Sequence, residues 1–100
     1  MIDGSFITGF QWDKANVTKS HDKHGIGCPE AESVFLASDL RILEDPQHST
    51  PAERRWHAFG TSSSARSLSV TFTFRPPLIR IISARPINAR ERKFYGYPKN

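Results

Sequence analysis

The eight-residue run Ser67 to Phe74 constrains the fold more than any other part of the chain. Small polar residues alternate there with the apolar residues Leu68, Val70, Phe72 and Phe74. Such alternation is typical of a strand that buries one face and leaves the other polar. Pro76 and Pro77 then turn the chain into a second apolar run, Leu78 to Arg85. We therefore expect two adjacent antiparallel strands that share one core.

Patterns in the rest of the chain predict an α+β protein. Gly25 and Pro29 mark the end of a first helix and the start of a second. The elements expected before the Ser-rich hairpin loop at 62–66 are a strand at Phe10–Trp12, a helix at Lys14–His24, a helix from Pro29, a strand at Leu40–Leu43 and a strand at Arg55–Thr61. They predict one domain over residues 1–100, with a small antiparallel sheet and helices packed on one face. The other face would present Thr71, Thr73 and Arg80.

The last part of the chain joins a strand end to a short helix. Pro86 cannot continue a central ladder, so the strand should end near Arg85. Asn88, with Glu91 three residues later, has the spacing of a capping box at a helix start. Gly96 and Pro98 then end the helix. We expect a C-terminal helix directly after the last strand.

Positive charge is concentrated in this same segment. Residues 75–100 hold seven Lys/Arg and one Glu, a sum of +6, whereas residues 1–74 hold seven Lys/Arg and nine Asp/Glu, a sum of −2. Guanidinium groups at a strand end and a helix start suit phosphate, because their planar forks bind its oxygens in pairs. The segment is therefore either a local anion site, with nucleic acid as the polyanion, or a solvated basic tail.

Several other classes of protein fit the sequence poorly. A single cysteine, Cys28, cannot form an intramolecular disulfide. No apolar run approaches the ~20 residues that span a bilayer, and the first residues lack the pattern of a signal peptide. We therefore expect a cytoplasmic protein without a membrane partner. His21, His24 and Cys28 have a spacing that could bring metal ligands together, and His48 or His57 could be proposed as a fourth. Structural zinc normally uses tighter, cysteine-rich pairs, so we expect no metal.

An ordered set of short motifs resembles one known family. The motifs are Phe10-x-Trp12-Asp13, Lys23-His24-Gly25, Glu30-Ala31-Glu32-x-Val34-Phe35, Asp45-Pro46-x-His48-Ser49, Arg55-Trp56-x-Ala58-x-Gly60, Arg80-Ile81-Ile82-Ser83-Ala84-Arg85 and Arg90-Glu91-Arg92-x-x-Tyr95. This set covers roughly residues 10–95 and resembles BrnT, the toxin of a bacterial type II toxin–antitoxin pair.

The resemblance implies a RelE-like fold, with helices on one face of the sheet and an RNA site on the other. It also implies an endoribonuclease that arrests growth, and an antitoxin, BrnA, whose DNA-binding part represses the operon. The toxin would then meet operator DNA only through the antitoxin. The sequence departs from the family's usual residues at Ser20, at Cys28 and Pro29, and at Ala65. The last change questions the hairpin geometry, because the family usually has Gly there and Gly tolerates a positive φ.

Cleavage of RNA without a metal needs a base for the 2′-hydroxyl, an acid for the 5′ oxygen and cations beside the phosphate. The expected products are a 2′,3′-cyclic phosphate and a 5′-hydroxyl. Arg80 and Arg85 are the first candidate cations, and the alternative for both is a salt bridge, for instance to Glu53 or Glu91. Arg55 is the third candidate, and its alternative is an exposed charge at the edge of the sheet. Strict alternation would separate Arg80 from Arg85, but the rule is loose at a strand end.

The remaining catalytic candidates are Glu91, Tyr95 and His48. Glu91 and Tyr95 lie four residues apart and share one helix face. Glu91 could act as a base, orient an arginine or simply cap the helix, and Tyr95 could donate a proton, stack on a base or pack. His48 has a side chain suited to proton transfer, although a loop histidine is more often solvated or bonded to a neighbour such as Asp45. The further RNA-binding candidates are Arg66, Arg90, Arg92 and Lys93.

Two other functions are compatible with the same basic segment. A non-catalytic nucleic-acid-binding module would bind through charge alone and leave RNA intact. A structural protein that exists to be bound by a partner would not depend on Arg85 for any effect on growth. These alternatives differ from a ribonuclease in what removal of single arginines does to RNA integrity and to growth.

Overall fold

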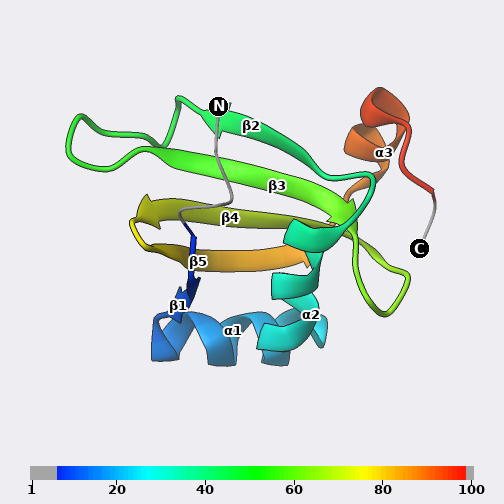
Figure 1. Ribbon diagram of the computed structural model, residues 1–100. Helices are drawn as coiled ribbons and strands as arrows, with labels where there is room; N and C mark the ends of the chain where they lie inside the picture. The colour runs from blue at the N-terminus through cyan, green and yellow to red at the C-terminus, as the bar shows by residue number, and fades with distance from the viewer. Residues whose placement is uncertain (1–6, 99–100) are drawn as a thin grey trace.

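The computed structural model describes residues 7–98, apart from the side chains of Val17 and Ser20. The described chain forms a five-stranded sheet with helices around it (Figure 1). The elements in chain order are β1 (Gly9–Trp12), α1 (Lys14–His24), α2 (Cys28–Ser33), the 3-10 helix η2 (Val34–Leu36), β2 (Arg41–Asp45), β3 (Arg55–Thr61), β4 (Ser67–Arg75), β5 (Leu78–Pro86) and α3 (Ala89–Tyr95). No helix in this part of the chain is long and apolar enough to cross a membrane.

The sheet is mixed, so the expectation of a purely antiparallel sheet is wrong. Its strand order is β1-β5-β4-β3-β2. The strands β2 to β5 form the expected antiparallel meander, whereas β1 runs parallel to β5. Strands joined by a tight turn must be antiparallel, but β1 is separated from β5 by most of the chain. No turn therefore fixes its direction.

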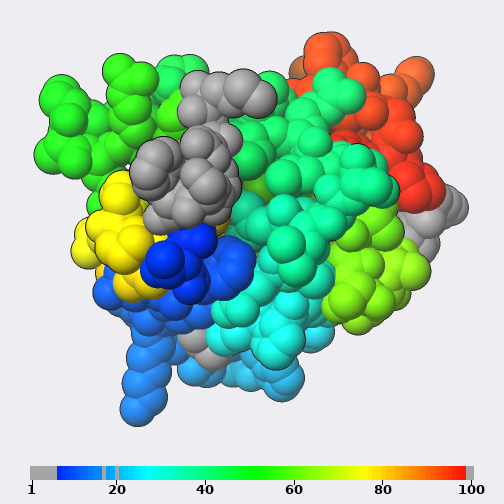
Figure 2. Space-filling model, viewed as in Figure 1, coloured from blue at the N-terminus to red at the C-terminus, as the bar shows by residue number. Residues whose placement is uncertain are grey.

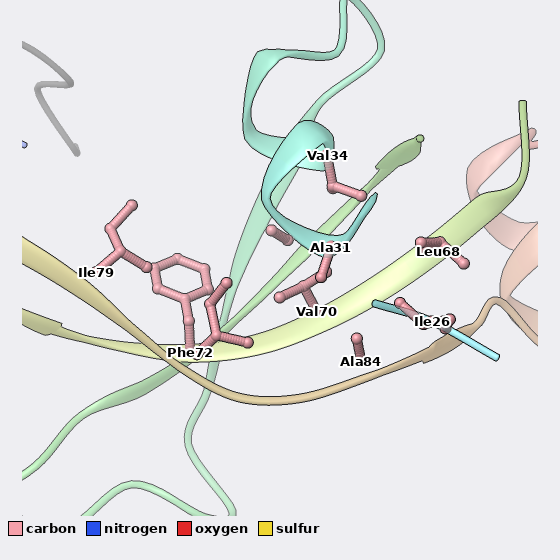
Figure 3. Packing of buried hydrophobic residues seen from close by; sticks show 10 residues of the cluster. Ile26, Ala31, Val34, Leu68, Val70, Phe72, Ile79 and Ala84 are labelled. Carbon is pink, nitrogen blue, oxygen red and sulfur yellow. The ribbon is translucent and has the colours of Figure 1, made fainter. Parts of the chain in front are cut away.

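The helical segment α2–η2 covers one face of the sheet. Ala31 and Val34 are fully buried there and lie over Val70 and Phe72 of β4 (Figure 3). The other buried members of this core are Ile26, Ala58, Leu68, Ile79, Ile81 and Ala84. The alternation in β4 is confirmed, because each of its apolar residues from Leu68 to Phe72 points into this core. The remaining face of the sheet is therefore available to polar residues.

This second face is polar, as expected, but its central strand is more enclosed than alternation alone suggests. Thr73 is buried, and its hydroxyl donates to the carbonyl oxygen of Arg54 at 2.7 Å. The hydroxyl of Thr71 is 3.0 Å from Nδ1 of His57 on β3. β4 lies in the middle of the sheet between β5 and β3, and of these two threonines Thr73 is buried and Thr71 half-buried.

The C-terminal helix α3 begins and ends as its sequence predicts. The side chain of Asn88 accepts from the backbone N–H of Glu91, and Glu91 accepts in return from the N–H of Asn88. Gly96 ends the helix in the left-handed conformation. Behind the helix, Tyr97 packs with Phe59 in a second apolar cluster. This packing holds α3 against the polar face of the sheet, near the end of β3.

The β3–β4 hairpin loop lies beside α2 on the surface (Figure 2). The hydroxyl of Ser62 donates to Oε2 of Glu30 at 2.7 Å, and the N–H of Ser63 donates to the hydroxyl of Ser33 at 2.8 Å. Ala65 has a φ of 62°, the left-handed conformation that favours glycine. The turn geometry is thus of the kind that suits a glycine, although the residue is alanine.

Strand β2 lies further along the chain than the predicted strand Leu40–Leu43. It spans Arg41–Asp45 and pairs with β3 from Arg41 opposite Phe59 to Asp45 opposite Arg55. Asp45 is therefore part of the sheet and not of a loop. This shift matters because it places the Asp45 carboxylate against β3.

Candidate functional site

An irregularity in β5 brings Arg80 and Arg85 to the same face of the sheet. Arg80 lies opposite Thr73, and Arg85 lies opposite Ser69. Between these pairs the register shifts by one residue, which leaves Ile82 as an extra residue in β5. Such a β-bulge reverses the alternation beyond it. Both arginines therefore project from the polar face, away from α2.

Arg80 is tied to the start of α1. Its Nη2 lies 3.5 Å from Oδ2 of Asp13, and the side chain is 24% exposed. Asp13 also accepts from the backbone N–H of Ala15 at 2.9 Å, which caps the helix. The guanidinium is held loosely by a carboxylate that is itself partly solvated, so a phosphate could compete for it.

Arg85 is held by Glu91 at the start of α3. Its two terminal nitrogens donate to the two carboxylate oxygens, at 2.8 Å each, and Nη1 also donates to the carbonyl oxygen of Pro86 at 3.1 Å. These hydrogen bonds from Arg85 hold the pKa of Glu91 below its usual value. They do not use all five N–H donors of a guanidinium. Arg85 is thus oriented and still able to bind an anion.

Asp45 joins two histidines at the end of β2. Its Oδ2 lies 2.8 Å from Nδ1 of His48 and 3.0 Å from Nε2 of His57. The carboxylate is 9% exposed. Burial raises the pKa of Asp45, but the hydrogen bonds from His48 and the charge of His57 outweigh it, so the pKa lies below its usual value. The charge of His57 also contributes to the lowered pKa of Glu91, which links this cluster to the Arg85–Glu91 pair.

Arg55 lies on the same face, at the start of β3. Its register partner on β4 is Thr73, which is also the partner of Arg80 on β5. Its Nε is 3.7 Å from Oε1 of Glu53, and Glu53 is shared with the exposed Arg75. The structure therefore brings Arg55 onto the polar face, with a weak ion pair.

Tyr95 packs against the sheet from α3. Its ring stacks on Phe59 with centroids 5.1 Å apart, and the guanidinium carbon of Arg41 is 5.2 Å from the ring centroid. These contacts give the ring a structural role that would hold α3, and with it Glu91, in place.

The other basic candidates lie on the β3–β4 hairpin loop and on α3. Arg66 forms a two-point ion pair with the largely buried Glu30, and its guanidinium also donates to the carbonyl oxygens of His24 and Gly25. These contacts fasten the hairpin loop to α2. The remaining three lie on α3, with Arg90 directly before Glu91 and Arg92 and Lys93 directly after it, and Arg90 and Lys93 are exposed.

The cluster on the polar face consists of the cations and carboxylates described above together with two histidines: Arg55, Arg80, Arg85, Glu91, Asp45, His48 and His57. The sequence did not point to His57 or Asp45 as catalytic candidates. His57 has the same parity as Arg55 in a predicted strand, which is a signal that it shares the face of Arg55. Its contact with Asp45 depends on β2 extending to Asp45. Within residues 7–98, no group of three metal-ligating side chains is arranged to hold a metal ion. The cluster combines cations with a carboxylate–imidazole pair, which suits phosphate binding and proton transfer.

A sequence profile of one protein family matches most of the chain. The family is described as "Ribonuclease toxin, BrnT, of type II toxin-antitoxin system", and the match covers residues 12–91. The chain belongs to the BrnT family. The family assignment brings with it an RNA substrate and an antitoxin partner. The matched residues include the bulged strand β5 and end at Glu91.

The fold of this BrnT-family protein is also found in a solved structure. It is similar to the crystal structure of the Brucella abortus ribonuclease toxin BrnT, with a TM-score of 0.61 and 20% sequence identity. The match covers 81% of this chain and 97% of the Brucella chain. No curated protein matches the chain. At this identity the solved structure supports the shared fold, whereas the family profile carries the assignment as a ribonuclease toxin.

Proposed function

We propose that this BrnT-family toxin is an endoribonuclease that cleaves RNA without a metal ion on the polar face of its sheet. The observation that carries the proposal is the bulge at Ile82, which places Arg80 and Arg85 on one face. A bulge beside a reaction site is a known means of redirecting a side chain. Without it, one of these two arginines would point into the apolar core.

In the proposed reaction, the 2′-oxygen of the RNA attacks the adjacent phosphorus and the bond to the 5′ oxygen breaks. A base accepts the 2′-hydroxyl proton, and an acid supplies a proton to the departing 5′ oxygen. The products are a 2′,3′-cyclic phosphate and a 5′-hydroxyl. Arg80 and Arg85 bind the phosphate and stabilise the charge that builds up on it, with Arg55 as a third cation.

His48 is the proposed proton-transfer group. Its Nδ1 is fixed by the buried carboxylate of Asp45, and the side chain is 60% exposed, so its other ring nitrogen is accessible. A carboxylate on one nitrogen of an imidazole orients the ring. Glu91 is a positioning residue for Arg85, and Tyr95 positions α3.

The proposal includes the partner and the place of action. A BrnA-like antitoxin would cover the polar face and its arginines with an acidic or apolar surface. Operator DNA would be contacted only through that antitoxin. The protein would act in the cytoplasm, where its RNA substrate is. A RelE-like classification of the fold is part of the same proposal.

The deciding experiment is induced expression in a bacterial host, with and without the neighbouring reading frame that would encode the antitoxin. Growth and the integrity of total RNA are followed for the wild type, R80A, R85A and the control variant R54A. Arg54 is an exposed arginine outside the cluster. We expect arrest and RNA fragmentation with the wild type and R54A, relief by the neighbour, and intact RNA with R80A and R85A.

Circular dichroism of the purified variants separates loss of activity from loss of fold. Arrest and fragmentation by folded R80A and R85A would contradict the assigned roles. Intact RNA with the wild type, together with salt-dependent RNA binding, would instead indicate a non-catalytic binding module.

A further inference from the structure

A groove lies between α1 and β5, next to Arg85. Its volume is about 290 Å³, close to the lower end of the usual size of small-ligand pockets. In Figure 1, α1 runs alongside β5, beyond the part of β5 that pairs with β1. The polar lining residues are Asn16, Lys19, Lys23, His24, Ser83 and Arg85.

The positive charge of the groove comes from two lysines and from Arg85, which is paired with Glu91. Lys19 and Lys23 are four residues apart in α1, so they share one helix face about 6 Å apart along the axis. Both are exposed, and neither forms an ion pair among the described side chains of residues 7–98. By contrast, Arg66, which donates to the carbonyl oxygen of His24, is paired with Glu30.

The environment of His24 reports the same positive field. Burial lowers the pKa of His24 most, followed by the charges of Lys23, Arg85 and Arg66. Burial and the neighbouring charges both disfavour protonation of the imidazole. A neutral ring beside lysines adds a hydrogen-bonding and stacking surface without competing for an anion.

We propose that the groove between α1 and β5 binds the backbone phosphates of the RNA strand next to the cleaved position. Lys19 and Lys23 contact successive phosphates, and Arg85 connects the groove to the reaction site. The inference rests on the proposed ribonuclease function and extends it, because it gives the direction in which the RNA leaves the site. Substrates must then extend beyond the cleaved phosphate to be bound well.

An RNA strand fits the groove better than an acidic protein segment does. Lys19 and Lys23 lie about 6 Å apart along one helix face, and their flexible side chains can adjust to two phosphates of one strand. The groove ends at Arg85, where a phosphate is already expected. Asn16 and Ser83 add uncharged hydrogen-bonding groups that a sugar and a base edge can use.

The test compares two double variants of the full chain. K19Q/K23Q removes both groove lysines, and K14Q/R54Q removes the same charge from exposed positions outside the groove. The probe is a fluorescent 2′-O-methyl RNA of about ten nucleotides, which lacks the attacking hydroxyl and stays intact. Binding is measured across salt concentrations, and circular dichroism checks the fold of each variant.

We expect K19Q/K23Q to bind at least about tenfold more weakly at low salt, with a salt dependence flatter by about 1.4 in the log–log slope. The K14Q/R54Q control should bind within about threefold of the wild type. Equal weakening by both double variants, or wild-type binding by K19Q/K23Q, would overturn the proposal. The proposal would also be overturned if K19Q/K23Q retained RNA binding but lost affinity for the antitoxin, because the groove would then bind a protein.

The outcome is separable from that of the proposed function. Cleavage of unmodified RNA by the wild type tests the ribonuclease, whereas the uncleavable probe tests the groove. If the wild type leaves RNA intact, and the probe binds the wild type but not K19Q/K23Q, the proposed reaction is rejected and the RNA groove is retained. A wild type that cleaves RNA, with a probe insensitive to these lysines, would keep the reaction and reject the groove.

Discussion

The guanidinium of Arg85 and the carboxylate of Glu91 form a two-point ion pair, with both nitrogen–oxygen distances at 2.8 Å. The same carboxylate accepts from the backbone N–H of Asn88 and closes the capping box of α3. One side chain therefore joins the end of β5 to the start of α3. A change at Glu91 should affect both the arginine and the helix.

Two substitutions at Glu91 separate these effects. Glutamine keeps the capping box, because its side-chain oxygen can still accept from Asn88, but it removes the charge that holds Arg85. We expect E91Q to lose less than about 1 kcal/mol of unfolding free energy, since Arg85 is 40% exposed and the pair is screened by solvent. E91A should lose about 1–2 kcal/mol, because the half of the capping box that accepts from the N–H of Asn88 is lost as well.

Urea denaturation measures the stabilities, and RNA cleavage measures the effect on Arg85. We expect both variants to cleave more slowly than the wild type, with their substrate affinity less affected than their turnover. Wild-type cleavage by a folded E91Q would show that Glu91 does not position Arg85 for the reaction.

The buried carboxylate of Asp45 should give the protein an acid-sensitive stability. Its pKa in the folded protein lies below the reference value of 3.8, so the unfolded chain binds a proton more readily. The stabilisation is therefore fully present above about pH 3.8 and is lost as the pH falls through the lower folded pKa. We expect D45N to be less stable than the wild type at neutral pH, with the difference shrinking below about pH 4.

Urea unfolding of the wild type and D45N across this pH range is the measurement. E44Q, an exposed neighbour whose carboxylate lies 3.4 Å from Arg54, is the control and should follow the wild type closely. A stability difference between D45N and the wild type that does not change with pH would contradict the role of the charged carboxylate.

Gly60 should be the glycine of the sheet that tolerates a side chain least. A Cβ at Gly60 would lie 3.2 Å from Cβ of Ala37 and 3.2 Å from Cγ1 of Val34. We expect G60A to lose about 1–3 kcal/mol, because η2 must move away from β3. The matched control is G9A, whose new Cβ would be 3.5 Å from Leu78, an ordinary contact. Thermal unfolding of both variants tests this, and an equally stable G60A would refute the close approach.

Replacement of Ala65 by glycine should stabilise the hairpin loop. Ala65 has a φ of 62°, and this left-handed backbone conformation destabilises an L-residue with a side chain by about 1–2 kcal/mol. Glycine removes that strain. It also increases the conformational entropy of the unfolded chain, which lowers the unfolding free energy by about 0.4–1 kcal/mol. We therefore expect a net gain of about 1 kcal/mol for A65G in urea unfolding. A52G, at an exposed position without a positive φ, should instead lose stability.

The elements that were predicted well are those with strong local signals. The alternation in β4, the turn at Pro76 and Pro77 and the capping box at Asn88 each depend on residues that are close in the sequence. Backbone hydrogen bonding and side-chain packing act at short range there, so the pattern is sufficient. The strand Leu40–Leu43 was predicted less well, because its end depends on pairing with β3.

The candidate site was predicted in part. The basic residues of β5 and the pairing of Arg85 with Glu91 were among the expectations, since both partners lie in one short segment. The ion pair of Arg66 with Glu30 was not, because the two residues are 36 positions apart and meet only when the hairpin packs on α2. The contact between Asp45 and His57 was missed for the same reason.

The α+β class, the hairpins, the caps and the concentration of positive charge in residues 75–100 follow from patterns in the amino-acid sequence. Three features depend instead on how the chain packs: β1 runs parallel to β5, Ile82 forms a bulge, and Arg80 and Arg85 share a face. The physical reason is that local patterns follow from hydrogen bonds and burial within a few residues. Strand direction and register follow from contacts between distant segments, which no single stretch of the chain specifies.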